Sequence, residues 1–140
     1  MKFWDSSALV AAVVVESGTA SIRGIGHRDP DRVIWRLTEI EIASGLWRRR
    51  RSNDLTEDAR SVAQHGADQL LSNAIVIADV PPVVNRARRL LATHNLRAAD
   101  ALQLAAALVA TEDQPSRFAF VTLDDRLAEA ASREGFTVLP

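Results

Sequence analysis

The sequence predicts an α/β fold, with a mostly parallel central sheet flanked by helices, and three observations support this prediction. Short apolar runs that suit buried strands alternate with stretches of helical period along the whole chain. Helices separate the successive strands, so the connections must be crossovers, which pair strands in parallel. A chain of 140 residues with 47% hydrophobic and 25% charged residues can bury a core but is too short for two large domains. We therefore expect one domain over residues 1–140.

Strands are expected where short runs of apolar, β-branched or aromatic residues lie between polar segments. The first run lies between Met1 and Asp5, and the last run ends at Leu139. The predicted strands are Lys2–Trp4, Val33–Trp35, Ala74–Ala78, Phe118–Thr122 and Phe136–Leu139.

Helices are expected where apolar residues recur at helical spacing and a capping residue or a proline marks the start. A polar, glycine-containing stretch up to Asp31 separates the first helix from the second strand, and no regular element is predicted in it. The predicted helices run from Ser6 to between Glu16 and Gly18, from Thr38 to the arginines at 48–51, from Thr56 to Leu71, from Pro81 to His94, from Arg97 to Val109 and from Asp124 to Glu134.

The absence of cysteine and the charge balance exclude several kinds of site. Without cysteine there is no disulfide, thiolate nucleophile, cysteine-based zinc site or iron–sulfur cluster, which fits a reducing compartment. Seventeen basic and eighteen acidic residues give a net charge of -1, so an anionic partner must be held by a local basic patch. The apolar run Ala8–Val15 is too short to cross a membrane, and Asp5 before it argues against an export signal. We expect a cytoplasmic protein with no membrane association.

Two aspartates follow predicted strands and should point to the same rim of the sheet. Asp5 comes directly after the first strand, and Asp124 comes just after the strand that ends at Thr122. Ligands of open parallel sheets bind beyond the carboxyl ends of the strands, so this rim is the candidate site. Taken singly, each aspartate fits better as the cap of the helix that it precedes.

Asp100 and a glutamate of the helix after Thr38 are further candidates. Asp100 is the only charged residue in the apolar stretch between Ala98 and Ala110, and an unpaired buried carboxylate is costly. It needs either a polar cleft or a structural pair with Arg97. Between Glu39 and Glu41, the small residues that follow Glu41 by three and four positions slightly favour Glu41, although a solvated glutamate would fit equally.

These residues lie in four segments that together resemble a known family. The segments are D-S-S-A-L-V at Asp5, E-I-A-S-G-L at Glu41, L-R-A-A-D-A-L-Q-L-A-A-A-L around Asp100 and F-V-T-L-D-D-R-L-A-E-A-A around Asp124. In this order and spacing they closely resemble the PIN-domain nucleases, and within them the VapC toxins of bacterial toxin–antitoxin pairs. The resemblance covers residues 2–139 and implies a single PIN domain with a three-layer PIN-like fold.

The resemblance also implies an activity, a site and partners. It implies an endoribonuclease toxin that forms a homodimer and is silenced by a VapB-type antitoxin. Asp125 is the alternative to Asp124, and the T-x-D spacing from Thr122 favours Asp124. The implied catalytic acids are Asp5, Glu41, Asp100 and Asp124, with Ser7 and Thr122 as polar supports.

Converging carboxylates need a cation, because two of them ~4 Å apart repel by about 4 kcal/mol at an effective dielectric constant of 20. Hard oxygen donors favour Mg²⁺, with Mn²⁺ as a substitute, over zinc. We expect Asp5 and Asp100 to be the principal metal ligands. Glu41 and Asp124 would support the same metal or complete a second site.

The arginine cluster Arg48, Arg49, Arg50 and Arg51 is the candidate RNA contact, with a second cluster at Arg86, Arg88 and Arg89. The same arginines could instead form a solvated helix end or the docking surface of an acidic partner. Trp35 and Trp47 could stack on bases, but their spacing favours core packing.

Other classes with acids at a sheet rim fit less well. A phosphoacceptor receiver domain needs a late lysine, and the last lysine is Lys2; a haloacid-dehalogenase-type phosphatase needs an acid where Ser7 stands. The remaining alternative is a catalytically inactive PIN-like module with a binding or assembly role.

Overall fold

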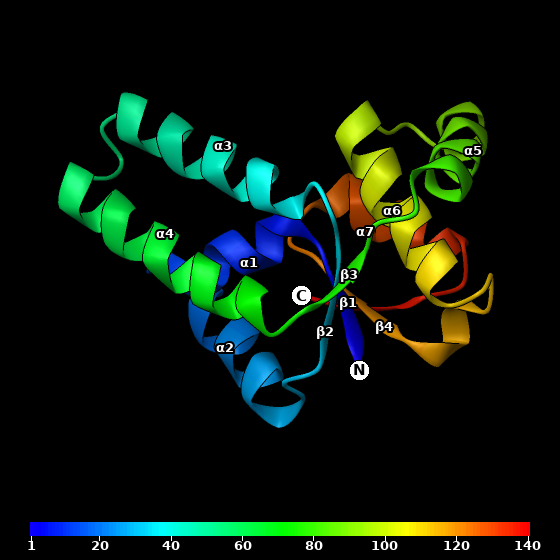
Figure 1. Cartoon of the computed structure of the whole chain (residues 1–140), viewed down its shortest axis with the longest axis horizontal. Helices are drawn as coiled ribbons and strands as arrows, with labels where there is room; N and C mark the ends of the chain where they lie inside the picture. The colour runs from blue at the N-terminus through cyan, green and yellow to red at the C-terminus, as the bar shows by residue number, and fades with distance from the viewer.

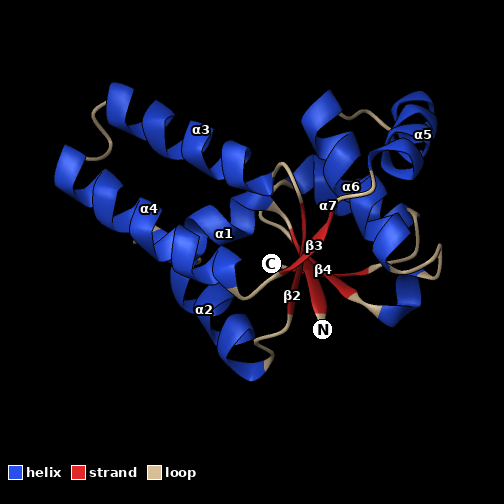
Figure 2. Ribbon diagram, viewed as in Figure 1, coloured by secondary structure: helices blue, strands red, loops and turns tan.

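The structure, a computed structural model, describes all 140 residues and has a five-stranded, all-parallel sheet between two groups of helices (Figures 1 and 2). The strand order is β3-β2-β1-β4-β5, so β1 is central and the chain reverses direction of winding beside it. The strands are β1 (Lys2–Trp4), β2 (Arg32–Trp35), β3 (Ile75–Ile77), β4 (Ala119–Val121) and β5 (Thr137–Leu139). The helices are α1 (Ser6–Val13), α2 (Thr19–Arg28), α3 (Thr38–Arg51), α4 (Glu57–Ser72), α5 (Val80–Thr93), α6 (Ala98–Ala110) and α7 (Asp125–Arg133), with a 3-10 turn at Pro115–Arg117.

The alternation of side chains along the strands builds one core on each face of the sheet. Phe3 and Phe120 point to the face covered by α5, α6 and α7, and their rings stack with centroids 5.4 Å apart. Trp4 and Val121, the next residue of each strand, point to the opposite face, where α1, α2, α3 and α4 pack. The prediction of a three-layer α/β fold with helices on both faces is therefore confirmed, and the sheet is wholly rather than mostly parallel.

The structure corrects two predicted elements on the second of these faces. The stretch before Asp31, where no element was predicted, contains helix α2, which buries Ile22 and Ile25 on one side. A Cβ on Gly26 would lie 3.2 Å from the Arg32 side chain, so this glycine permits the close packing of α2. Helix α1 ends at Val13, earlier than predicted, because the valine run turns extended at Val14, where φ is -100° and ψ is 128°.

Helices α3 and α4 project beyond the sheet as an antiparallel pair, at the left of Figure 1. The prediction that Trp47 packs in the core is wrong: its side chain is 43% exposed on α3, and the Arg60 guanidinium of α4 lies 4.1 Å from its ring centroid. Trp35 is buried, as predicted. No helix in the structure has both the length and the apolar character needed to span a membrane.

Candidate active site

An acidic cleft of about 990 Å³ opens at the carboxyl ends of the central strands, between α3 on one side and the first turns of α6 and α7 on the other. Strand order reverses at β1, so this is where an open parallel sheet binds ligands. The residues that line the cleft are Ser6, Ile40, Glu41, Ser44, Arg48, Arg97, Ala99, Asp100, Leu123, Asp124, Asp125 and Arg126.

Asp5 lies at the buried base of this region, directly after β1, and is only 3% exposed. Its Oδ2 accepts hydrogen bonds from the Ser7 backbone N–H at 3.1 Å, the Ser7 hydroxyl at 2.5 Å and the Thr122 hydroxyl at 3.0 Å. Its Oδ1 has only the Ser6 hydroxyl, at 3.4 Å. Burial raises the pKa of Asp5, and the hydrogen bonds from Ser7 and Thr122 offset part of that rise.

Asp5 and Asp124 each cap a helix and also lie at or beside the cleft. Asp5 caps α1 through Oδ2, and Asp124 caps α7 by accepting from the Leu127 backbone N–H at 2.8 Å through Oδ1. Each cap occupies one carboxylate oxygen. The other oxygen of Asp124 accepts no hydrogen bond within the protein, so it remains free for a ligand.

Glu41, rather than Glu39, faces the cleft. Glu39 is exposed, whereas Glu41 is half-buried and its Oε2 accepts from the Ser6 hydroxyl at 2.9 Å and from Gln103 Nε2 at 3.0 Å. Burial is the main reason that the pKa of Glu41 is raised, and the negative charges of Asp5 and Asp100 raise it further. The Glu41 carboxylate therefore lies near two other acids and forms no salt bridge.

Asp100 is half-buried on the first turn of α6 and faces the cleft from the side opposite Glu41. Its pKa is raised by burial first and then by the charges of Asp124 and Asp5, while the Arg97 guanidinium makes the smallest contribution. The alternative of a structural Arg97 pair therefore does not account for Asp100.

Asp124 and Asp125 both line the cleft but differ in burial. Asp124 is half-buried and its charge acts on Asp100, whereas Asp125 is exposed and begins α7. Both aspartates therefore lie at the cleft, and Asp124 is the more buried of the two.

The four acids influence one another but do not form a closed metal cage. No group of three or more His, Cys, Asp or Glu side chains is spaced so as to hold a metal ion by itself. The donor set is all carboxylate oxygen: one oxygen of Asp124 accepts no hydrogen bond, and Oδ1 of Asp5 accepts only the 3.4 Å hydrogen bond from Ser6. Such a set fits Mg²⁺, which keeps several waters and is usually held by one or two carboxylates together with substrate phosphates.

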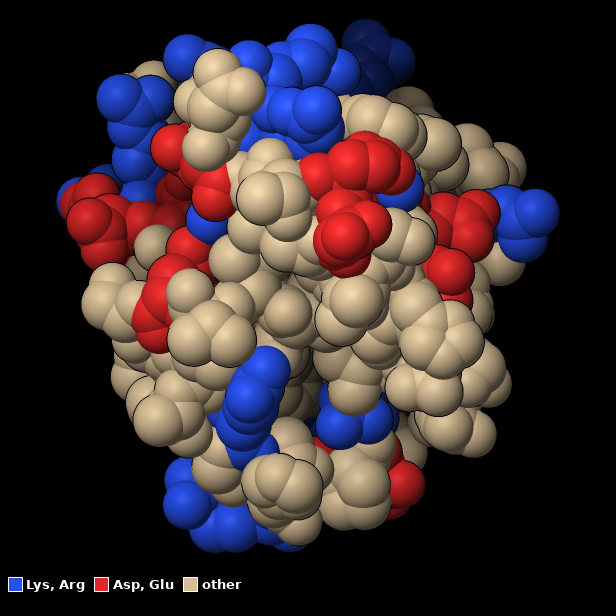
Figure 3. All heavy atoms as spheres, turned by 90° about the vertical axis from the view of Figure 1, so that its left-hand side faces the viewer, with Lys and Arg blue, Asp and Glu red and all other residues tan.

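Only one member of the predicted arginine cluster reaches the cleft. Arg49 pairs with Glu16 at 2.6 Å, and Arg50 lies 3.8 Å from Glu57. Arg48, in contrast, lines the cleft and has no ion pair. The same is true of Arg97 and Arg126, which were not predicted as RNA contacts. Figure 3 shows basic side chains gathered at the top of the face where α3 and α4 meet, above a band of acidic ones.

The second predicted arginine cluster lies elsewhere and is largely neutralised. Arg86 pairs with Asp113, and Arg89 pairs with Glu134 at 2.8 Å. These arginines stabilise the contact of α5 with the segments after α6 and α7, and they do not line the cleft.

Three residues of the site were not identified from the sequence. Ser6 and Gln103 both bind Glu41, and Arg126 lies beside the acids at the start of α7. A signal existed for Gln103, which is the only amide in the apolar helix α6. The contacts of Ser6 and Arg126 depend on how α1, α3 and α7 pack, which no local pattern encodes.

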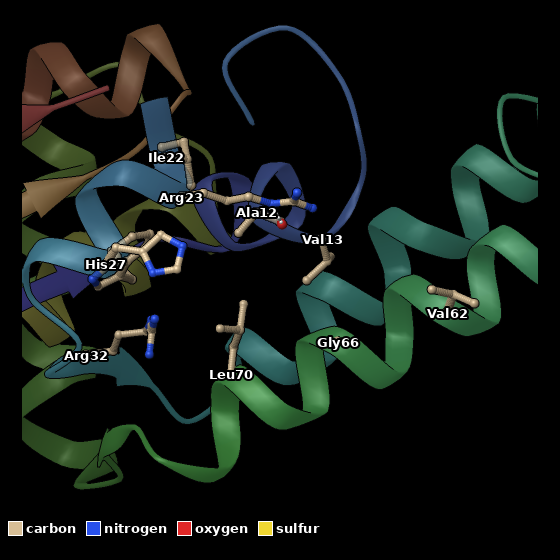
Figure 4. Close-up of a pocket in the computed structure, with 11 residues that line it drawn as sticks. Ala12, Val13, Ile22, Arg23, His27, Arg32, Val62, Gly66 and Leu70 are labelled. Atoms are coloured by element: carbon tan, nitrogen blue, oxygen red, sulfur yellow. Dashed lines mark hydrogen bonds between the residues drawn. The ribbon is translucent and has the colours of Figure 1, made fainter. Parts of the chain in front are cut away.

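A second cavity, of about 390 Å³, lies on the opposite side of α1 (Figure 4). It is bounded by α1, α2 and α4, and no acidic side chain lines it. Its labelled residues are Ala12, Val13, Ile22, Arg23, His27, Arg32, Val62, Gly66 and Leu70. This apolar groove with a basic rim has no carboxylate, and His27 is its one side chain able to bind a metal or to act as an acid or base.

Comparison with known proteins agrees with this architecture. The family model of the PIN domain matches residues 2–133. A toxin–antitoxin complex from Klebsiella pneumoniae is similar in structure, with a TM-score of 0.67 and 17% identity over 100% of this chain and 97% of that chain. The protein PAE2754 from Pyrobaculum aerophilum has a TM-score of 0.64 and 25% identity over 92% of this chain and 83% of that chain. No protein of curated function matches the sequence significantly.

Proposed function

This chain belongs to the PIN-domain family, and from that premise we propose that it is a Mg²⁺-dependent endoribonuclease that acts as the toxin of a toxin–antitoxin pair. PIN domains are typically metal-dependent nucleases. The observation that carries the proposal is that Glu41, Asp100 and Asp124 line one cleft with Asp5 close by, and that none of these four acids forms a salt bridge.

The proposed metal ligands are Asp5 and Asp100, with Glu41 and Asp124 supporting the same metal or a second one. Bound Mg²⁺, or Mn²⁺ in its place, would activate a water and stabilise the charge that develops on a phosphodiester. The protein's own part is to hold the carboxylates in place. Ser7 and Thr122 fix Asp5 through Oδ2, and the cap at Leu127 fixes Asp124 through Oδ1.

Arg48, Arg97 and Arg126 are the proposed phosphate contacts, because they line the acidic cleft without ion pairs of their own. This replaces the predicted set Arg48 to Arg51, in which Arg49 and Arg50 are engaged with glutamates. Replacing Arg126 by Gln should weaken RNA binding and lower the slope of log affinity against log salt by about 1. Arg133→Gln, on the same helix but paired with Glu129, is the control and should leave the slope unchanged.

The toxin role also implies a homodimer and a cognate VapB-type antitoxin, and the groove of Figure 4 suits the latter. Val62 is 73% exposed on the α4 side of this groove, and Arg23, His27 and Arg32 supply basic groups on the side formed by α2 and β2. A partner segment with apolar residues and an acidic side chain would fit. Val62→Glu should therefore weaken antitoxin binding in a calorimetric titration while leaving RNA cleavage intact; unchanged antitoxin affinity would move the partner to another surface.

Cleavage of RNA by the purified protein tests the proposal as a whole. The wild type should produce defined cleavage ends with Mg²⁺ or Mn²⁺, and none after chelation with EDTA. Its expression alone should arrest growth, and co-expression with the neighbouring antitoxin gene should relieve the arrest. RNA binding without products at any metal concentration would instead favour the alternative, a catalytically inactive PIN-like module with a binding or assembly role.

A further inference from the structure

Gln103 is a fully buried amide on a helix that otherwise packs alanine and leucine against the sheet. It lies on α6, one turn after Asp100, and none of its surface is exposed. Its neighbours on this helix, Ala101 and residues 104–108, belong to the hydrophobic core. A buried amide is costly unless it is hydrogen-bonded, so its partners must account for its presence here.

The two donors of this amide have two partners on α3. Nε2 donates to Glu41 Oε2 at 3.0 Å and to the buried Thr38 hydroxyl at 3.1 Å. A carboxylate only accepts, so the nitrogen rather than the oxygen of the amide must face Glu41. Thr38, one turn before Glu41 on the same helix, fixes the orientation of the amide from its other side.

Both hydrogen bonds to Glu41 fall on the same oxygen. The Ser6 hydroxyl donates to Oε2 at 2.9 Å, as Gln103 does, and no donor binds Oε1. One oxygen of Glu41 is therefore anchored between α1 and α6, and the other is left without a protein partner in a side chain that lines the cleft.

We propose that Gln103 is a positioning residue, which holds Glu41 by Oε2 so that Oε1 is presented to the acidic cleft. This inference rests on the proposed function, because the cleft is where Glu41 would meet a metal ion or its bound water. Groups that orient a ligating carboxylate affect metal affinity although they do not touch the metal.

The test is a double-mutant cycle on Mn²⁺ affinity, measured by isothermal titration calorimetry. Gln103→Met keeps the volume and removes the donors, and it should weaken Mn²⁺ binding by about 10-fold. Glu41→Ala should weaken it as well, and the double variant should bind no more weakly than Glu41→Ala alone, because Gln103 acts only through Glu41. Thr111→Val is the matched control: Thr111 is equally buried at the end of α6 but bonds only to its own helix. It should leave the affinity unchanged.

Unchanged Mn²⁺ affinity in Gln103→Met would overturn the inference. The inference would also be overturned if Gln103→Met lowered Mn²⁺ affinity by the same factor in the wild type and in Glu41→Ala. The amide would then act through packing and not through Glu41.

A second readout needs no metal and separates this inference from the proposed function. In the wild type, the side-chain amide protons of Gln103 should exchange slowly with solvent in NMR spectra, and Glu41→Ala should shift and deprotect them. If the wild type binds no Mn²⁺, the proposed function fails. The amide protons of Gln103 would still show whether Gln103 is hydrogen-bonded to Glu41. Amide signals that do not respond to Glu41→Ala would contradict this hydrogen bond.

Discussion

The two ends of strand β1 place aspartates in opposite surroundings. At its amino end, Asp29 accepts hydrogen bonds from the Lys2 ammonium and from the N-terminal amine, both at 2.5 Å, and these cations lower its pKa to about 2. At its carboxyl end, Asp5 is bound by hydroxyls and one backbone N–H, and burial raises its pKa. The same strand therefore separates a neutralised carboxylate from one that is kept without a cation.

Two acids on the other side of the molecule follow the Asp29 pattern. Asp113 and Glu134 each pair with an arginine, which lowers their pKa values. Among the acids only Asp5, Glu41 and Asp100 have raised pKa values; Glu41 and Asp100 line the cleft, and the charge of Asp5 acts on both. The chain is rich in arginine, so the unpaired acids reflect local arrangement rather than a lack of cations. A cleft that retains negative charge at a cost to stability is suited to binding a cation from solution.

The largest expected difference between the two ends of β1 is in catalysis. Asp5→Asn keeps a capping side chain but removes the charge, and loss of several kcal/mol of metal-assisted stabilisation should lower the rate of RNA cleavage at least ~10³-fold. Asp29→Asn should cleave at nearly the wild-type rate. Both variants should give the wild-type circular dichroism spectrum. Near-normal cleavage by Asp5→Asn would remove Asp5 from the site.

The two regions should also differ in the sign of their effect on stability. Asp100→Asn relieves repulsion by Asp124 and Asp5, so it should raise the free energy of unfolding by about 1 kcal/mol, the scale of a solvent-screened like-charge contact. For a chain of this length that is roughly 3 °C in Tm. Asp29→Asn removes a partly exposed pair and should lower stability by up to about 1 kcal/mol. Thermal unfolding without metal measures both effects, and a destabilised Asp100→Asn would show that Asp100 is not under net repulsion in the folded protein.

The smallest expected difference between the Asp29 and Asp100 regions is in how the free energy of unfolding depends on pH. Asp29 has a lowered pKa, so its stabilisation is present above about pH 4 and is lost as the pH falls towards 2. Asp100 has a raised pKa, so ionising it costs stability, and the advantage of Asp100→Asn should be absent at pH 3 and grow as the pH rises towards neutrality. Urea denaturation across this range measures both trends. A constant difference between Asp100→Asn and wild type at all pH values would contradict this account.

Much of the fold could be predicted from the sequence because its signals are local. The runs at Lys2–Trp4 and Val33–Trp35 alternate between the two cores, and the structure confirms both strands. Helix α2 was missed because its glycines weaken the helical signal, and one of them, Gly26, is there for its packing against Arg32 and Trp4.

The site was predictable only as far as strand order determines it. Asp5 and Asp124 each follow a strand of a parallel sheet, so both could be placed at the carboxyl edge of the sheet without knowledge of side-chain contacts. Strand order could not show that Glu16 engages Arg49, or that Gln103 reaches Glu41 from another helix, because both contacts join residues far apart in the chain. Tertiary packing decides which arginines remain free, and the sequence pattern does not.

The central claim is that the cleft acids together bind a divalent cation, and a calorimetric Mn²⁺ titration tests it most directly. We expect saturable binding to the wild type and to Asp29→Asn, with binding lost or greatly weakened in Asp5→Asn and Asp100→Asn. A wild type that binds no Mn²⁺, or an Asp5→Asn variant that binds it as tightly as the wild type, would show that these acids do not form a cation site.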